Sequence, residues 1–335
     1  MKVFENISLK EYNTFGIDVK ARRMVMVEPK DSVECIVDSI RGQEVLVLGA
    51  GSNMVFTKDY GGTIIILSRD SSKHAVRQLG NFVNAWGGMV MDDLIQWSLD
   101  NGLSGLENLS AIPGTVGASA VQNVGAYGAE AKDFIDSVEA YDLQERCRCT
   151  FTNTNCQFAY RDSFFKHYPG RYLILRVVYR LNKEYTPNLS YKALEGLPHD
   201  TAQQLRDAIT ELRWSKLPRP EENGSAGSFF KNPVVDEETY LHLKAEYPNM
   251  PDAHPVSISN IQSLIGYKLS AGWLIDKAGW KGCTQGRAGV WPKNALVLYN
   301  TDGCSGEEVQ SLAIAIQQDV KQKFGVSLDP EAIII

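Results

Sequence analysis

One stretch of this sequence, residues 112–130, restricts the possible folds more than any other. It reads IPGTVGASAVQNVGAYGAE, with Gly114, Gly117, Gly125 and Gly128 among small residues and a single charged side chain. Such a run is too rich in glycine for an ordinary core helix and too apolar for a linker. Glycines permit positive φ and close approach of a ligand, and the freed backbone N–H groups can hold an anion. The stretch predicts a loop around a large, partly apolar, phosphate-bearing cofactor; the alternative is a loop buried for packing alone.

Composition narrows the class of protein. The chain has 335 residues, 44% hydrophobic and 22% charged, which is typical of a soluble globular protein of two or three domains. Its net charge of −6 argues against nucleic acid as a main partner. The N-terminal segment lacks the apolar core of a signal peptide, and no aliphatic run could span a membrane. Six cysteines without metal-ligand spacing indicate reduced thiols, so we expect a cytoplasmic monomer with no metal site.

A second glycine loop, residues 49–53, follows a predicted buried strand at residues 45–48. Its sequence is GAGSN, which lacks the third glycine of the GxGxxG dinucleotide motif, and the residues after it are typical of a strand rather than a helix. A Rossmann fold is therefore disfavoured. The loop either binds a pyrophosphate through its N–H groups and the side chains of Ser52 and Asn53, or is a plain tight turn.

Other local patterns predict the surrounding elements. Asp31 with Glu34 predicts the N-cap of a helix, and Ser305 with Glu308 predicts a capping box for the last helix. Residues 248–266 show no clear periodicity and are expected to form an irregular loop. The sequence has no histidine pair and no Ser-His-Asp order. A redox or sugar-nucleotide function therefore suits the chain better than hydrolysis.

Seven motifs occur in one order between residues 13 and 331, and together they resemble the bacterial UDP-N-acetylenolpyruvoylglucosamine reductases, in the subgroup with the longer substrate-binding domain. They are NTFG at 13–16, GAGSN at 49–53, IPGTVGASAVQNVGAYG at 112–128, YRDSFFK at 160–166, NGSAGSFFKNP at 223–233, AGWLID at 271–276 and LDPE at 328–331.

The resemblance implies an α+β chain, with a two-domain FAD-binding fold of the vanillyl-alcohol-oxidase type and a third α+β domain for the substrate. The implied boundaries are residues 1–67 with 323–335 returning, residues 68–217, and residues 218–322. FAD would be bound non-covalently. The residues that would hold it are Gly49, Ala50, Gly51, Ser52, Asn53, Ile112, Pro113, Gly114, Ser119, Asn123, Gly125, Gly128 and Arg213.

The reaction that the resemblance implies is the NADPH-dependent reduction of UDP-N-acetylglucosamine enolpyruvate to UDP-N-acetylmuramate, for peptidoglycan synthesis. Hydride would pass from NADPH through FAD to the vinyl carbon. Arg161 in YRDS and Glu331 in LDPE match the family's stabilising residues, and Ser228 matches its proton donor. A glutamate beside an anionic intermediate helps only if it is protonated or orients a donor. A serine hydroxyl is a weak acid and must act on a strongly basic carbanion.

For the sugar nucleotide, the matching positions are Tyr191, Lys216, Asn232 and Lys268. The sequence departs from the family at two places: His254 stands near the usual lid tyrosine, with residues 256–266 following it, and Ile333 stands where many members have arginine. Two other functions are considered: a related FAD-dependent oxidoreductase with a different substrate, and a catalytically silent sugar-nucleotide-binding protein. The second would not require Arg161, Ser228 and Glu331 together.

Overall fold

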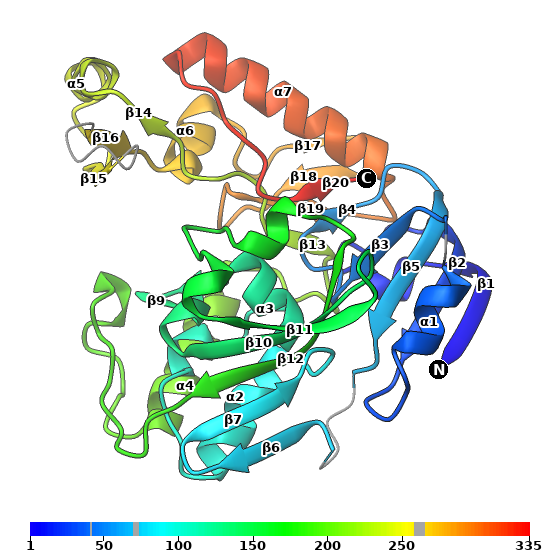
Figure 1. Ribbon diagram of the computed structural model, residues 1–335. Coiled ribbons are helices and arrows are strands. Elements are labelled where there is room, and N and C mark those ends of the chain that lie inside the picture. Colours follow the sequence, from blue (N-terminus) through cyan, green and yellow to red (C-terminus); the bar gives the residue numbers. More distant parts are fainter. Residues whose placement is uncertain (41, 70–73, 258–264) are drawn as a thin grey trace. The chain divides into compact units, whose positions relative to one another are not determined.

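The computed structural model describes residues 1–40, 42–69, 74–257 and 265–335. The chain divides into two compact units. Unit 1 comprises residues 1–7, 20–51 and 60–215, and unit 2 comprises residues 8–19, 52–59 and 216–335. Helices and sheets occur in both, so the chain is α+β (Figure 1).

Unit 1 begins with a four-stranded sheet in which three strands run parallel. Strands β2 and β3 both pair with β5 in parallel, so their carboxyl ends lie at one edge. This is the edge at which open α/β sheets bind their ligands. The sheet order is β1 (Lys2–Ser8), β2 (Lys20–Val27), β5 (Tyr60–Leu67) and β3 (Val45–Leu48), and α1 (Glu34–Ser39) follows β2 along the chain.

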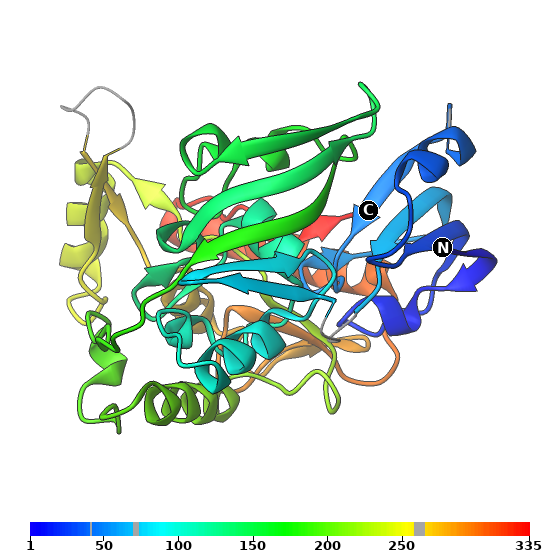
Figure 2. The same cartoon turned by 60° about the horizontal axis from the view of Figure 1, so that its bottom comes forward.

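A five-stranded antiparallel sheet forms the rest of unit 1. Its order is β11 (Cys147–Thr152), β10 (Ile135–Asp142), β12 (Tyr172–Arg180), β7 (Phe82–Trp86) and β6 (Val76–Leu79). The helices α2 (Met91–Asp100), α3 (Val116–Gln122) and α4 (Ala202–Lys216) accompany it, and Figure 2 shows α2 and α4 on the same face of the sheet. A small hairpin of β8 (Gly125–Ala126) and β9 (Ala129–Glu130) follows α3.

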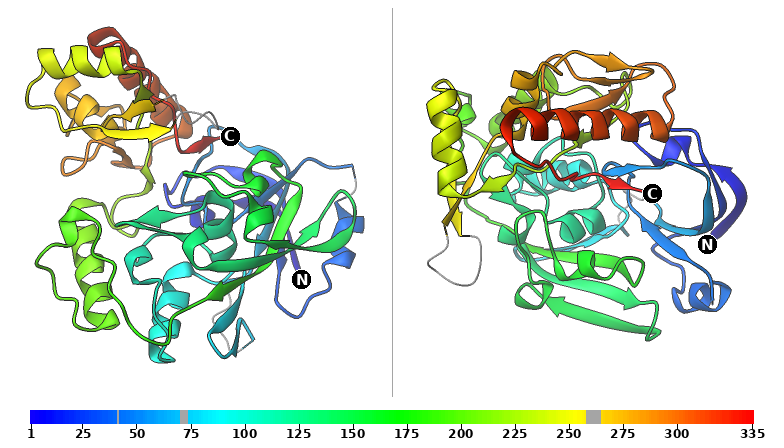
Figure 3. Two further views of the ribbon diagram at one scale, coloured as in Figure 1. Left: turned by 60° about the vertical axis from the view of Figure 1, so that its left-hand side comes forward. Right: turned by 90° about the horizontal axis from the view of Figure 1, so that it is seen from above.

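Unit 2 combines three small sheets with three helices. The sheets are β13 (Ser225–Ser228), β19 (Val297–Asn300), β18 (Ala288–Val290) and β17 (Thr284–Gln285); β14 (Val234–Val235), β16 (Ile265–Lys268) and β15 (His254–Ser257); and β20 (Ile333–Ile334) with β4 (Met54–Val55). The helices are α5 (Glu237–Glu246), α6 (Ala271–Ala278) and α7 (Gly306–Phe324). Figure 3 shows α7 lying along the β17–β19 hairpin, and its apolar stripe lies in the core of this unit.

Three local predictions differ from the structure. Residues 116–122 form α3 rather than loop, because the Thr115 hydroxyl caps it by accepting from Ala118 N at 3.3 Å and because small side chains let it pack closely. Asp31 does not cap α1; its carboxylate accepts from Glu28 N at 2.8 Å instead. Residues 254–257 form strand β15 rather than irregular loop, because they pair with β16. The Ser305–Glu308 capping box is confirmed.

Candidate active site

The first glycine loop leaves the carboxyl end of β3. Gly49 is exposed, and a Cβ placed there would lie 3.1 Å from both Thr115 Oγ1 and Ala118 Cβ. The loop and the first turn of α3 are therefore in close contact. Gly51 has a φ of +64°, which favours glycine, and Ala50 is half-buried between the two glycines. A side chain at Gly49 would therefore crowd α3, whereas glycine leaves the loop backbone exposed.

In the second glycine stretch, residues 112–128, some residues are accessible to a ligand and others are buried and support the fold. Gly114 and Ile112 are half-buried and Pro113 is exposed, so all three can contact a ligand. Ser119 and Asn123 are instead buried and engaged within the protein. The Ser119 hydroxyl donates to Val116 O at 2.7 Å, and Asn123 Nδ2 donates to Ala159 O at 2.8 Å. In this structure these two side chains hold α3 and its neighbouring loop, and their contact with a cofactor stays a prediction.

Arg161 lies in a tight turn in which Ala159 and Asp162 exchange both backbone hydrogen bonds. Its φ is +54°, an uncommon conformation for a residue with a side chain. Its Nη2 donates to Gly125 O at 2.7 Å, and a Cβ at Gly125 would lie 3.1 Å from Nη1. The structure thus brings Arg161 onto the glycine stretch, and Gly125 leaves space for the guanidinium.

Arg213, near the end of α4, lies beside Tyr127. The Arg213 Nε atom is buried and has no hydrogen-bond partner, while its guanidinium contacts the Tyr127 hydroxyl. Burial lowers the pKa of Arg213, and the positive charge of Arg161 lowers it further. Tyr127 in turn packs edge-on against Tyr191, with ring centroids 5.5 Å apart. Two arginines and two tyrosines thus gather near the hairpin after α3.

Tyr127 was not among the residues predicted from the sequence. Its φ of +49° places it between Ala126 and Gly128 in the turn of the β8–β9 hairpin. Gly128, with a φ of +85°, is the exposed residue of this turn, and a Cβ there would collide with Ser190 Oγ at 2.3 Å. A lone aromatic residue between small residues in a cofactor loop was the available signal.

Unit 2 brings Ser228 and Glu331 together. Ser228 is the exposed last residue of β13, and the next residue, Phe229, is fully buried. Phe229 O accepts from Glu331 N at 2.7 Å, which fixes the two segments side by side. Asn53 joins them, since its Nδ2 donates to Glu331 O at 3.1 Å. The GAGSN and LDPE motifs, almost 280 residues apart in sequence, are therefore in contact through Asn53 and Glu331. Ser52, the residue before Asn53, belongs to the same unit.

Three of the predicted substrate residues lie on or beside one small sheet of unit 2. Lys268 in β16 is opposite His254 in β15 and opposite Val234 in β14. Directly opposite residues share a face, so His254 and Lys268 project on the same side. Asn232 lies just before β14, and its Oδ1 accepts from Ala271 N at 3.0 Å. The part of the predicted lid at residues 258–264 lies outside the described residues.

The remaining two substrate candidates lie on other elements. Tyr191 is exposed and packs on Tyr127, as described above. Lys216 is the exposed last residue of α4. In the described part of the chain, no three metal-ligating side chains gather, and no helix is long and apolar enough to cross a membrane.

The residues present fit FAD. An exposed glycine loop at a sheet's carboxyl edge suits a pyrophosphate, and the partnerless Nε of Arg213 calls for an acceptor that the protein itself does not supply. Residues 49–53 would hold the pyrophosphate, and residues 112–128 together with Arg213 would line the flavin.

Family models agree with this assignment. One for the FAD binding domain matches residues 21–147, and one for the UDP-N-acetylenolpyruvoylglucosamine reductase C-terminal domain matches residues 219–335. The fold and the site therefore define an FAD-binding oxidoreductase with a fold of the vanillyl-alcohol-oxidase type.

Individual relatives narrow the class further. The chain is 42% identical over 340 residues to a UDP-N-acetylenolpyruvoylglucosamine reductase of Pseudomonas aeruginosa, covering 99% of this chain and 98% of that one. It is also 42% identical to one of Burkholderia ambifaria, covering 98% and 95%. The solved reductase from Thermus caldophilus shares the fold, with a TM-score of 0.69 at 23% identity and coverage of 100% and 99%. The chain belongs to the UDP-N-acetylenolpyruvoylglucosamine reductase family, whose cofactor is FAD and whose co-substrate is NADPH.

Proposed function

We propose that this chain reduces UDP-N-acetylglucosamine enolpyruvate to UDP-N-acetylmuramate, with Ser228 as the proton donor. The observation that carries the proposal is the Phe229–Glu331 backbone hydrogen bond of 2.7 Å, which sets the exposed Ser228 beside Glu331. A Ser228 hydroxyl beside the polar Glu331 side chain suits protonation of the carbanion that hydride addition to the substrate would produce. The relatives named above are reductases of this kind over nearly their whole length.

FAD, when bound, would supply the hydride from NADPH that reduces the terminal vinyl carbon of the substrate. The negative charge that develops toward the substrate carboxylate then requires stabilisation. Arg161 is suited to this, because its planar guanidinium stays charged and binds a carboxylate through two donors. The hydrogen bond to Gly125 O aims it from a strained turn, so its orientation is fixed before the substrate arrives.

Ser228 then gives its proton to the carbon next to the ether oxygen and regains one from solvent. Its position is fixed because the two residues after it, Phe229 and Phe230, are buried anchors at 0% and 1% exposure. Glu331 is held through its backbone by Phe229 and Asn53, which orients its side chain. We assign Glu331 to the stabilisation of the negative charge that Ser228 neutralises, either as the neutral acid or by orienting a hydrogen-bond donor.

We assign the sugar-nucleotide diphosphate to Lys216, Asn232 and Lys268, with Tyr191 and His254 as further contacts. Two ammonium groups and a neutral donor suit a pyrophosphate. The proposed domains are residues 1–67 with 323–335, 68–217 and 218–322. The parallel pairing of β20 with β4 returns the C-terminus to residues 54–55, and both strands belong to the same compact unit as residues 216–335.

The test is anaerobic stopped-flow absorbance of the flavin. The NADPH-reduced protein is mixed with UDP-N-acetylglucosamine enolpyruvate or, as a control, with UDP-N-acetylglucosamine. We expect rapid reoxidation with the first compound only, and UDP-N-acetylmuramate as the product. A flavin that NADPH reduces but that the enolpyruvyl compound does not reoxidise would point to a related oxidoreductase with another substrate. Absence of bound flavin would favour the silent binding protein.

A further inference from the structure

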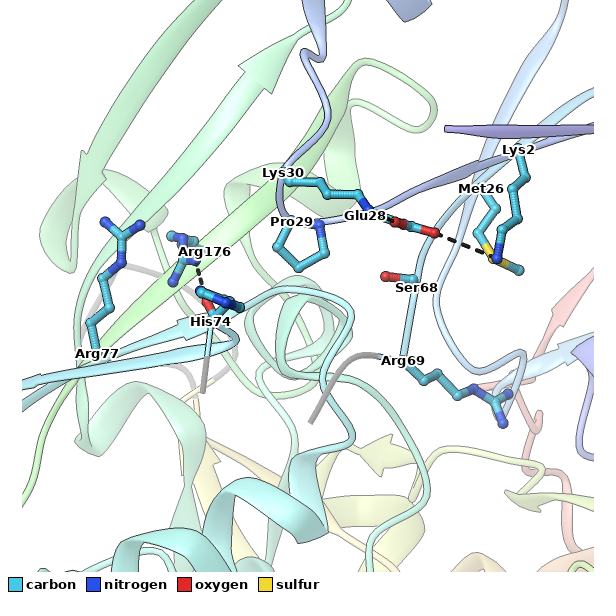
Figure 4. Close-up of a pocket in the computed structure, with 10 residues that line it drawn as sticks. All are labelled: Lys2, Met26, Glu28, Pro29, Lys30, Ser68, Arg69, His74, Arg77 and Arg176. Atoms are coloured by element: carbon cyan, nitrogen blue, oxygen red, sulfur yellow. Dashed lines mark hydrogen bonds and ion pairs between the residues drawn. The ribbon is translucent and has the colours of Figure 1, made fainter. Parts of the chain in front are cut away.

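Unit 1 contains a cavity of about 570 Å³ that shares no lining residue with the proposed flavin site. It opens where β2 and β5 end, at the carboxyl edge of the parallel part of the sheet, and β6 and β12 supply its other wall. Figure 4 shows Arg77 and Arg176 on one side, with Pro29 and Lys30 across from them. Ligands of open α/β sheets gather at this edge.

The charge of the cavity is strongly positive, although the chain as a whole carries −6. Among the described residues, five lysines and arginines line it, and Glu28 is the one carboxylate. Glu28 is already shared by Lys30 at 3.1 Å and Lys2 at 3.5 Å. The Glu28 carboxylate is therefore paired with two lysines and forms no ion pair with Arg77 or Arg176 on the opposite side.

Arg176 shows this excess most clearly. The half-buried guanidinium donates to neutral oxygens, Asn84 Oδ1 at 3.1 Å and His74 O at 3.0 Å. Glu139 lies near it, but the Glu139 carboxylate accepts from Asn84 Nδ2 at 2.9 Å. Burial lowers the pKa of Arg176, and the neighbouring Arg77 lowers it further. An anionic ligand that enters this cavity, in addition to the Glu28 carboxylate, would therefore be attracted by both Arg77 and Arg176.

Two further features suit an organic ligand rather than a bare ion. Ser68 Oγ is buried at the cavity wall and has no hydrogen-bond partner among the described residues, which is unusual for a buried hydroxyl. Met26 and Pro29 give the same cavity an apolar surface. The cavity therefore offers two arginines for an anion, a hydroxyl for one hydrogen bond and an apolar wall for a ring.

We propose that this cavity is a second ligand site, which binds a nucleotide with its phosphates at Arg77 and Arg176 and its base against Met26 and Pro29. The site would be distinct from the one that holds FAD, because the glycine loops, Arg161 and Arg213 are not among its lining residues. This proposal does not depend on the reaction assigned above.

The experiment uses the FAD-loaded protein and isothermal titration with ATP, with adenosine and inorganic pyrophosphate as partial probes. We expect saturable binding of ATP, weaker binding of pyrophosphate and none of adenosine, with no release of FAD. Arg77→Ala should weaken ATP binding about tenfold, because it removes a charged contact from a phosphate. The Arg77 side chain is exposed, so folding should be unaffected. Arg22→Ala, an exposed arginine near the start of β2, is the matched control and should change nothing.

Three results would overturn the proposal. One is the absence of saturable ATP binding at millimolar concentration. Another is ATP binding that Lys216→Ala abolishes and Arg77→Ala leaves intact, which would place the nucleotide at the substrate position. The third is displacement of FAD by ATP, which would make the cavity part of the cofactor site.

Discussion

The hydrogen-bonding capacity of the Arg213 guanidinium is not fully used by the other described residues of the protein. Its Nε is buried without an acceptor, and the Tyr127 hydroxyl is its hydrogen-bonding partner. A buried charge with incomplete partners lowers stability. Such a residue is retained where a ligand completes its hydrogen bonds, and the resemblance had placed Arg213 at the flavin.

The prediction for this pair concerns two variants of the FAD-free protein. Arg213→Leu should not lower the free energy of unfolding, because it removes a poorly satisfied charge. Tyr127→Phe should lower it by about 1–3 kcal/mol, because the guanidinium loses its partner. Both should weaken FAD binding. Urea unfolding and flavin fluorescence titration measure the two effects. A marked loss of stability in Arg213→Leu with unchanged FAD affinity would show that Arg213 is structural.

Among single residues, the sequence predicted candidates from distinctive motifs, and it did not reveal contacts between distant segments. Arg161, Ser228 and Glu331 were assigned from YRDS, GSFF and LDPE. The pairing of Ser228 with Glu331 could not be read from spacing, because a backbone hydrogen bond between distant segments creates it. Tyr127 was not singled out, although it is a lone aromatic residue among small ones, because its contact with Arg213 joins distant segments.

At the scale of elements, composition was a weaker guide than local capping. The glycines of residues 112–130 suggested a loop, yet Thr115 and Asn123 bound a seven-residue helix, α3, at either end. Asn123 ends it with a φ of +45°. The small residues permit this helix to pack closely, and a Cβ at Gly117 would lie 3.1 Å from Gly87 O. Close packing was the role of these glycines that the sequence alone did not reveal.

Helix α7 begins with a capping box whose effect depends on pH. The Glu308 carboxylate accepts from Ser305 N at 2.8 Å and from Arg287 Nη2 at 3.0 Å. These contacts lower the pKa of Glu308 from 4.5 to about 2. A carboxyl with a lowered folded-state pKa stabilises the protein above its unfolded value, and this contribution is lost as the pH falls through the folded value.

We therefore expect Glu308→Gln to have a smaller loss of thermal stability than the parent protein between about pH 5 and pH 2. At pH 7 the variant should melt at a lower temperature than the parent. Glu307→Gln, an exposed neighbour outside the box, is the control and should follow the parent. Calorimetry over this range checks the prediction, and parallel curves for parent and Glu308→Gln would refute it.

At the scale of the whole chain, unit 2 is built from three separated segments. Residues 52–59 and the C-terminus are joined by the β4–β20 pair and by Thr57 Oγ1, which donates to Ile335 O at 2.7 Å. The order of motifs along the sequence predicted the family and the FAD-binding fold. It could not predict this interleaving, which depends on strand pairs between distant segments.

A pyrophosphate held by the glycine loops should make the stability of the whole protein depend on FAD. At free FAD one hundred times its Kd, binding should add about 2.7 kcal/mol to the free energy of unfolding. Riboflavin, which lacks the pyrophosphate, should add much less at equal concentration. Thermal shift of the FAD-free protein measures both ligands, and equal shifts would exclude a pyrophosphate contact at residues 49–53.

We propose that Ser228 donates the proton in the second half-reaction and has no part in the first. The decisive measurement is stopped-flow kinetics of both half-reactions in Ser228→Ala, with Ser225→Ala, at the other end of β13, as the control. NADPH should reduce the flavin of Ser228→Ala at nearly the parent rate. Reoxidation by the enolpyruvyl sugar nucleotide should slow by about 10²–10⁴-fold. Reoxidation at the parent rate would contradict the assignment of Ser228 and the mechanism built on it.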